Sequence, residues 1–64
     1  MEVKAGDTIQ IIEMKGEPNY SGRIGVVKFI DDMGQLHGSW GGLAVIPEED
    51  FFKKIGGTEK WVHM

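Results

Sequence analysis

Apolar and polar residues alternate along short stretches of this chain, and glycine-rich breaks separate the stretches. Ile9 and Ile11 alternate with polar neighbours, which predicts a half-buried strand over residues 7–14. Ile12 and Met14 continue the apolar pattern on the opposite face. A change of face within a strand predicts either a β-bulge or strong coiling of the strand, both of which are expected at the corners of a barrel.

A second strand is predicted over residues 23–31, which are rich in β-branched and aromatic side chains and bounded by turn formers. Gly25 lies inside it, where a missing side chain lets a neighbouring backbone approach. Residues 15–22 contain many turn formers and are predicted to be a loop. This second strand is the strongest local signal in the chain.

Three shorter strands are predicted downstream, over residues 35–40, 43–46 and 51–55. Gly34 suits the hairpin turn before the first of them, and Gly41-Gly42 predicts a two-residue hairpin before the next. Pro47 and the carboxylates after it favour one helical or 3₁₀ turn before the last strand.

Together these elements predict an all-β fold, a small five-stranded SH3-like barrel over residues 1–56 with a C-terminal tail over residues 57–64. The predicted barrel core has ten apolar members, namely Ile9, Ile11, Val27, Phe29, Leu36, Trp40, Leu43, Val45, Phe52 and Ile55.

The amino-acid composition excludes several kinds of site and partner. The chain has 64 residues, no cysteine and two histidines, so we expect no disulfide, no zinc site and no other metal or cofactor. The sequence shows neither a secretory signal nor an apolar run of about 18 residues, so we expect a cytoplasmic protein without a membrane partner. The net charge of −3 disfavours strong non-specific binding to nucleic acid.

Several short segments of the chain together carry a family resemblance. They are residues 3–7, the pattern Gly22-x-x-Gly25-x-Val27, residues 32–37, Trp40, residues 43–47 and Asp50-Phe51. They resemble the KOW-type pattern of SH3-like barrels. More closely, they resemble a small bacterial and phage family known as domain-of-unknown-function family 4314. The resemblance implies the barrel fold and a phage or mobile-element setting, and it implies no reaction. Gly38 departs from the family, which usually carries a β-branched residue there.

No catalytic motif is present, so we expect that the chain is not an enzyme. Asp31-Asp32 is an acid pair at a hairpin turn, where carboxylates are usually solvated turn formers. Glu48-Glu49-Asp50 lacks the alternating spacing of a calcium loop.

Binding is the class of function that remains. The candidate binding residues are Tyr20, Arg23, Lys28, His37, Trp40 and Trp61. Tyr20 near Trp40 would form a groove for a protein partner, which is the function we expect. Nucleic acid is the alternative partner, held by stacking on these rings and by contacts from basic side chains to phosphates. Trp61, in the tail, is expected to pack back on the barrel or across a homodimer.

Overall fold

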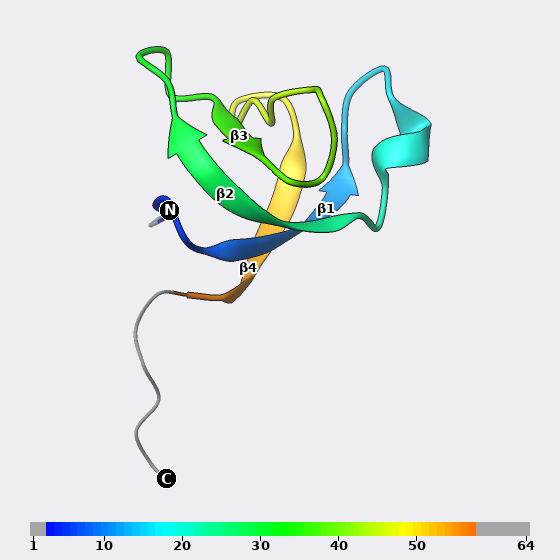
Figure 1. The fold of residues 1–64 in the computed structure, drawn as a ribbon. Helices are drawn as coiled ribbons and strands as arrows, with labels where there is room; N and C mark the ends of the chain where they lie inside the picture. The colour runs from blue at the N-terminus through cyan, green and yellow to red at the C-terminus, as the bar shows by residue number, and fades with distance from the viewer. Residues whose placement is uncertain (1–2, 58–64) are drawn as a thin grey trace, which may run out of the picture.

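Four strands and one short 3₁₀ helix make up the computed structural model, which describes residues 3–57 (Figure 1). They are β1 (Thr8–Glu13), η1 (Pro18–Tyr20), β2 (Ile24–Ile30), β3 (Leu36–Gly38) and β4 (Phe51–Gly56). The strands form one antiparallel sheet in the order β3-β2-β1-β4. The all-β prediction is therefore confirmed. No helix in residues 3–57 is long and apolar enough to cross a membrane.

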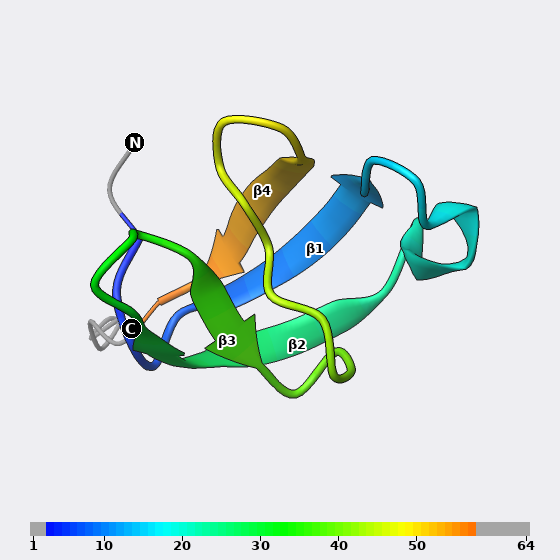
Figure 2. The same ribbon diagram turned by 90° about the horizontal axis from the view of Figure 1, so that it is seen from above.

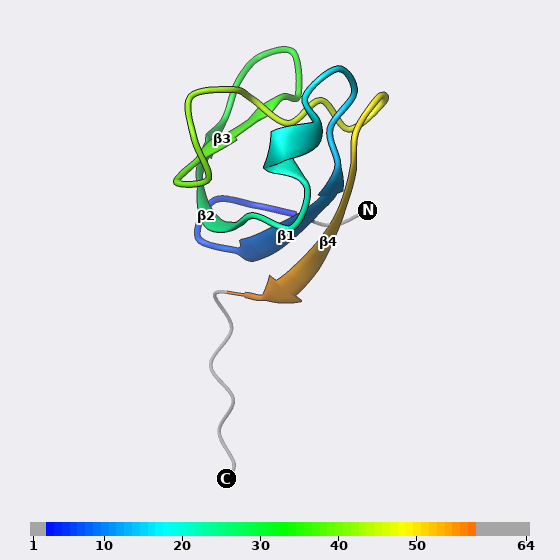
Figure 3. The ribbon, with the colours of Figure 1, turned by 90° about the vertical axis from the view of Figure 1, so that its right-hand side faces the viewer.

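The structure has four strands where five were predicted, and within residues 3–57 the sheet does not close into a barrel. Of the predicted strand over residues 43–46, only Val45 pairs, exchanging two backbone hydrogen bonds of 2.8 Å with Leu36. Gly41-Gly42 does not form the predicted hairpin, because the chain leaves β3 at Gly38 and turns Trp40 inward. The sheet curls strongly (Figure 3), but β3 and β4 do not pair with each other within residues 3–57.

The inner face of the curled sheet carries the core. Ile9 and Ile11 of β1 and Val27 of β2 are completely or almost completely buried, as their alternation predicted. After β3 the chain runs back across the sheet before it enters β4 (Figure 2), so this segment covers the inner face. The buried core consists of Ile9, Ile11, Met14, Val27, Leu36, Trp40 and Val45, with Val3, Tyr20 and Phe52 packed against it.

Three residues predicted for the core are exposed instead. Phe29 follows a register shift in the pairing of β2 with β3, and this irregularity interrupts the alternation that placed it beside Val27. Leu43 lies in the segment that does not form a strand, and Ile55 alternates with the inward-facing residues of β4. Met14, which the sequence placed on the opposite face, is buried where the chain leaves β1.

Two local predictions concern bends in the chain. The expected bulge in the first strand is confirmed, since the register of β1 against β4 shifts between Ile11 and Glu13. Before β4, residues 47–49 form a hydrogen-bonded turn in which the Ile46 carbonyl accepts from the backbone N–H groups of Glu49 and Asp50. The 3₁₀ helix itself lies elsewhere, at η1, within the segment predicted to be a loop.

Candidate functional site

Tyr20 and Arg23 lie together beside the segment that follows β3. The Arg23 guanidinium carbon lies 4.0 Å from the centre of the Tyr20 ring, a cation–π contact. Arg23 Nη1 donates to the Trp40 carbonyl at 2.8 Å, and its Nε donates to the Asn19 carbonyl at 3.3 Å. At Gly41, where φ is +150°, an added Cβ would lie 2.7 Å from the Tyr20 hydroxyl. Arg23 therefore fastens η1 to the chain after β3.

The Trp40 ring is buried, with 3% of the residue's surface exposed. It occupies space left by two glycines: a Cβ at Gly25 would lie 2.8 Å from the Trp40 backbone nitrogen, and one at Gly38 would collide with the Val26 carbonyl and the Trp40 ring. Its Nε1 donates to the Leu43 carbonyl at 2.8 Å. The predicted core position of Trp40 is therefore confirmed, and it is the Trp40 backbone carbonyl, not its ring, that meets Arg23 beside Tyr20.

His37 is half-buried and packs within the hairpin that joins β2 to β3. Its ring stacks on Phe29 with centroids 4.4 Å apart and planes 3° from parallel. Its Nε2 lies 2.8 Å from Asp31 Oδ2, and Asp31 Oδ1 accepts from the backbone N–H groups of Met33 and Gln35. These contacts, the hydrogen bond from His37 first, hold the pKa of Asp31 below its ordinary value. Asp31 thus stabilises the turn.

Two buried carboxylates lie far from that turn. Asp50 accepts hydrogen bonds from the backbone N–H groups of Ile46 at 2.8 Å and Lys15 at 2.9 Å. Asp7 accepts from the Lys4 backbone N–H at 2.9 Å, and its Oδ2 lies 3.4 Å from Lys54 Nζ. Both carboxylates join segments distant in sequence, so they stabilise the fold.

Two shallow depressions of about 410 and 290 Å³ lie on either side of Met14. The buried ionisable side chain that reaches one of them is Asp50, and both of its oxygens already accept hydrogen bonds from backbone N–H groups. No group of three or more His, Asp or Glu side chains within residues 3–57 is arranged to hold a metal ion. Within the described residues, the depressions therefore hold no metal-binding group of this kind.

The outer face of the sheet was not among the predicted site residues. Ile9, Ile11 and Val27 point inward, so the residues that alternate with them on β1 and β2 point outward, and on β4 the residues that alternate with Phe52 do the same. We call this surface the outer face. Its apolar members are Ile12, Ile24, Val26, Phe51 and Ile55, and its polar members are Thr8, Gln10, Glu13, Lys28 and Lys53.

A comparison with known protein families matches residues 2–55 to the family described as Domain of unknown function (DUF4314). The chain belongs to this family. Neither the curated proteins nor the solved structures contain a match to it.

Within this DUF4314 domain, the predicted binding residues are scattered. Tyr20 and Arg23 are in contact, whereas His37 lies in the β2–β3 hairpin and Lys28 projects from the outer face. Trp61 lies outside the described residues. The signal for the outer face was present in the sequence, as the alternation of Phe51, Lys53 and Ile55, but an inward Ile55 was inferred from it.

Proposed function

We propose that this DUF4314 domain is a non-catalytic cytoplasmic module that binds a protein partner through the outer face of its sheet. The observation that carries the proposal is the distribution of apolar side chains. Nine large apolar residues of the described chain are exposed, against seven that form the buried core. Large apolar residues that gather on one exposed surface usually mark an interaction site.

The outer face supplies five of those nine residues from three adjacent strands. Val26 is paired with Thr8, and Ile24 with Gln10, so the apolar side chains of β2 lie next to the small or uncharged polar side chains of β1. A surface that combines apolar area with few charges suits burial against another protein.

The remaining candidate chemistry supports a binding role over catalysis. Asp31 is an acid whose pKa is lowered by its contacts, and its oxygens accept hydrogen bonds from His37 and from two backbone N–H groups. A general acid or base needs a proton position open to a substrate. The contacts of Asp31 are instead those of a residue that holds a turn.

We propose that the curled sheet is an open form of the SH3-like barrel, in a protein of phage or mobile-element origin. The antiparallel order β3-β2-β1-β4 and the strong curl support the first part. The bridge between Leu36 and Val45 stands where a further strand would add to β3. The origin rests on the family resemblance alone.

Capture of partners from a lysate of the encoding organism tests the function. We expect the tagged chain to retain a protein that the double variant Ile24→Thr, Val26→Thr loses, because threonine keeps strand propensity while removing apolar area. Met33→Thr is the matched control, since Met33 is 75% exposed at the tip of the β2–β3 hairpin, away from the outer face. Equal retention by all three proteins would contradict the proposal.

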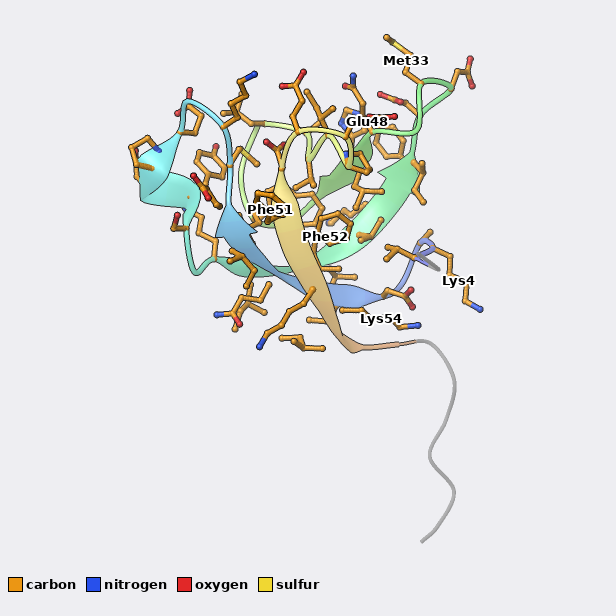
Figure 4. All side chains as sticks on the ribbon, turned by 180° about the vertical axis from the view of Figure 1, so that it is seen from behind. Lys4, Met33, Glu48, Phe51, Phe52 and Lys54 are labelled. Carbon is orange, nitrogen blue, oxygen red and sulfur yellow. The ribbon has the colours of Figure 1, made fainter. Side chains whose placement is uncertain are left out.

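Nucleic-acid binding is the second candidate, favoured by Lys53 and Lys54 within β4 and by Lys4, which lies on the same side of the molecule as Lys54 (Figure 4). Phosphate contacts strengthen as salt is lowered. A gel-shift series with single- and double-stranded DNA and RNA tests it, and a chain that shifts none of them at low salt excludes this function.

A further inference from the structure

We propose that the free edge of β4 receives an extended segment of a protein partner, added antiparallel as a further strand, with an acidic residue between two apolar ones. This inference rests on the proposed role as a protein-binding module and names the surface and the kind of partner. It concerns backbone pairing at the edge of the sheet as well as contacts on the outer face.

The edge of β4 is open. Within residues 3–57, β4 pairs with β1 and with no other strand, so one side of its backbone lacks strand partners. Figure 4 shows β4 running across the front of the molecule with no described segment over it. An exposed edge of six residues is a template for strand addition, in which backbone hydrogen bonds supply affinity and alternate side chains supply specificity.

The side chains along this edge specify the partner. Phe51, Lys53 and Ile55 alternate on the outer face, and all three are exposed. Lys53 makes no ion pair with any residue of the described chain. Residues directly opposite each other in a sheet interact, so Lys53 favours a carboxylate across from it and its neighbours favour apolar side chains.

The electrostatics of the same corner favour an acidic segment. Lys54 lies next to Lys53 and is half-exposed beside Asp7, and Lys4 lies on the same side of the molecule (Figure 4). Asp7 neutralises part of the charge of Lys54, so within the described residues the lysine of β4 without an ion pair is Lys53, on a chain whose net charge is −3. Attraction for an acidic strand is therefore concentrated where β4 is unpaired.

A second copy of the chain fits this edge poorly. An antiparallel pairing of two β4 strands centred on Lys53 would place one lysine directly opposite the other. Like charges in opposite positions destabilise a sheet. This register of self-pairing is therefore disfavoured, whereas a partner with a carboxylate opposite Lys53 is favoured in it.

Titration of the ¹⁵N-labelled chain with blocked peptides of about nine residues tests the inference. The probe has the central sequence valine–threonine–glutamate–threonine–valine, and its matched control carries lysine in place of glutamate. We expect amide shifts within residues 51–56 and about tenfold tighter binding of the glutamate peptide. Lys53→Glu should reverse the preference, and Lys28→Glu, the same change on β2 of the outer face, should preserve it. A glutamate peptide N-methylated at alternate positions should bind at least tenfold more weakly.

Several results would overturn the inference. It fails if the peptide does not bind, if the peptide shifts only amides outside β4, or if the N-methylated peptide binds equally well. Amide shifts of β4 that depend on protein concentration without peptide would show that a second copy pairs with the edge. Amide shifts of β4 caused by an oligonucleotide alone would show that nucleic acid binds there. The proposed function is tested separately: a partner retained by Lys53→Glu but lost by the Ile24, Val26 double variant excludes the β4 edge while preserving the interaction role. If the unmodified chain captures no partner at all, both the proposed function and this inference are contradicted.

Discussion

The two edge strands of the sheet differ in how much of their outer backbone is paired. β3 has three residues, and its outer edge is bonded to Val45 at Leu36. β4 has six residues and no strand on its outer side within residues 3–57. Proteins usually protect the edge strands of their sheets. In this chain the β3 edge is protected by its own chain, whereas the β4 edge carries two lysines and leaves its backbone available.

The difference shows where this small domain places its stabilising contacts. On the β3 side, Gly25 and Gly38 make room for Trp40, and Arg23 holds the chain that follows it. On the β4 side, Phe51 and Ile55 are 65% and 47% exposed. We therefore expect substitutions near β3, or at the buried contacts that return the chain to the sheet, to affect stability strongly, and substitutions along β4 to affect mainly binding.

The largest loss of stability is expected for Asp50→Ala. This substitution removes the carboxylate that links the turn before β4 to Lys15. Removing the carboxylate leaves the backbone N–H groups of Lys15 and Ile46 without their acceptor. Each buried unsatisfied donor costs about 1–3 kcal/mol, so we expect a loss of about 2–4 kcal/mol in the free energy of unfolding by urea titration. Glu48→Ala, at an exposed position of the preceding turn, is the control and should stay within about 0.5 kcal/mol of the wild type.

Gly38→Ala comes next and tests the protected edge directly. An alanine Cβ would collide with the Val26 carbonyl and the Trp40 ring, so β2 and β3 must separate or the indole must move. Overpacking of this kind costs about 1–3 kcal/mol, measured as a lower urea midpoint. Gly42→Ala is the matched control, because nothing lies within 4 Å of its added Cβ. Equal stability of both variants would show that Trp40 does not fill the space beside β3.

A pH-dependent effect is expected for Asp31 in the β2–β3 hairpin. Folding lowers the pKa of Asp31, so its contribution to stability is complete above the unfolded pKa of about 3.9 and is lost as the pH falls through the lower folded value. We expect Tm to fall less steeply below pH 4 in Asp31→Asn than in the wild type. Asp32→Asn, at the exposed neighbouring position, should keep the wild-type slope. Parallel slopes for wild type and Asp31→Asn would contradict the role of this carboxylate.

The smallest effect on stability is expected at the open edge. Phe51→Thr removes an exposed ring that opposes Glu13 outside the core, so the free energy of unfolding should change by no more than about 0.5 kcal/mol. A loss above about 2 kcal/mol would show that Phe51 belongs to the core, and the contrast between the two edges would fail.

Much of the inner face followed from local alternation. Ile9, Ile11 and Val27 were placed correctly because β1 and β2 are regular where they pair, and Gly25 was expected to allow a close approach. Phe29 was misplaced because a bulge shifts the register after Val27, and the position of a bulge depends on the partner strand.

The rest depends on tertiary contacts that local periodicity does not encode. Trp40 was expected both in the core and at the binding groove, and its ring fits beside the sheet because Gly25, on β2, and Gly38, two residues before it, carry no side chain. Residues 43–46 have the composition of a strand, yet they cross the sheet and bond at Val45 alone. The open edge of β4 emerged only when the order of the strands showed which side of β4 lacks a neighbour within residues 3–57.

The pairing of β1 with the last strand has a consequence for how the chain folds. β1 can pair with β2 after closing a short loop, but Asp50 bonds to Lys15 across 35 residues, and β4 must span a similar separation. Contacts that close long loops form slowly, because the entropy lost in closing the loop precedes the gain. During synthesis on the ribosome, the edge of β1 that pairs with β4 therefore stays unpaired until β4 has been made. We expect the nascent chain to depend on rapid completion, or on a chaperone, to avoid pairing that edge with a neighbouring polypeptide.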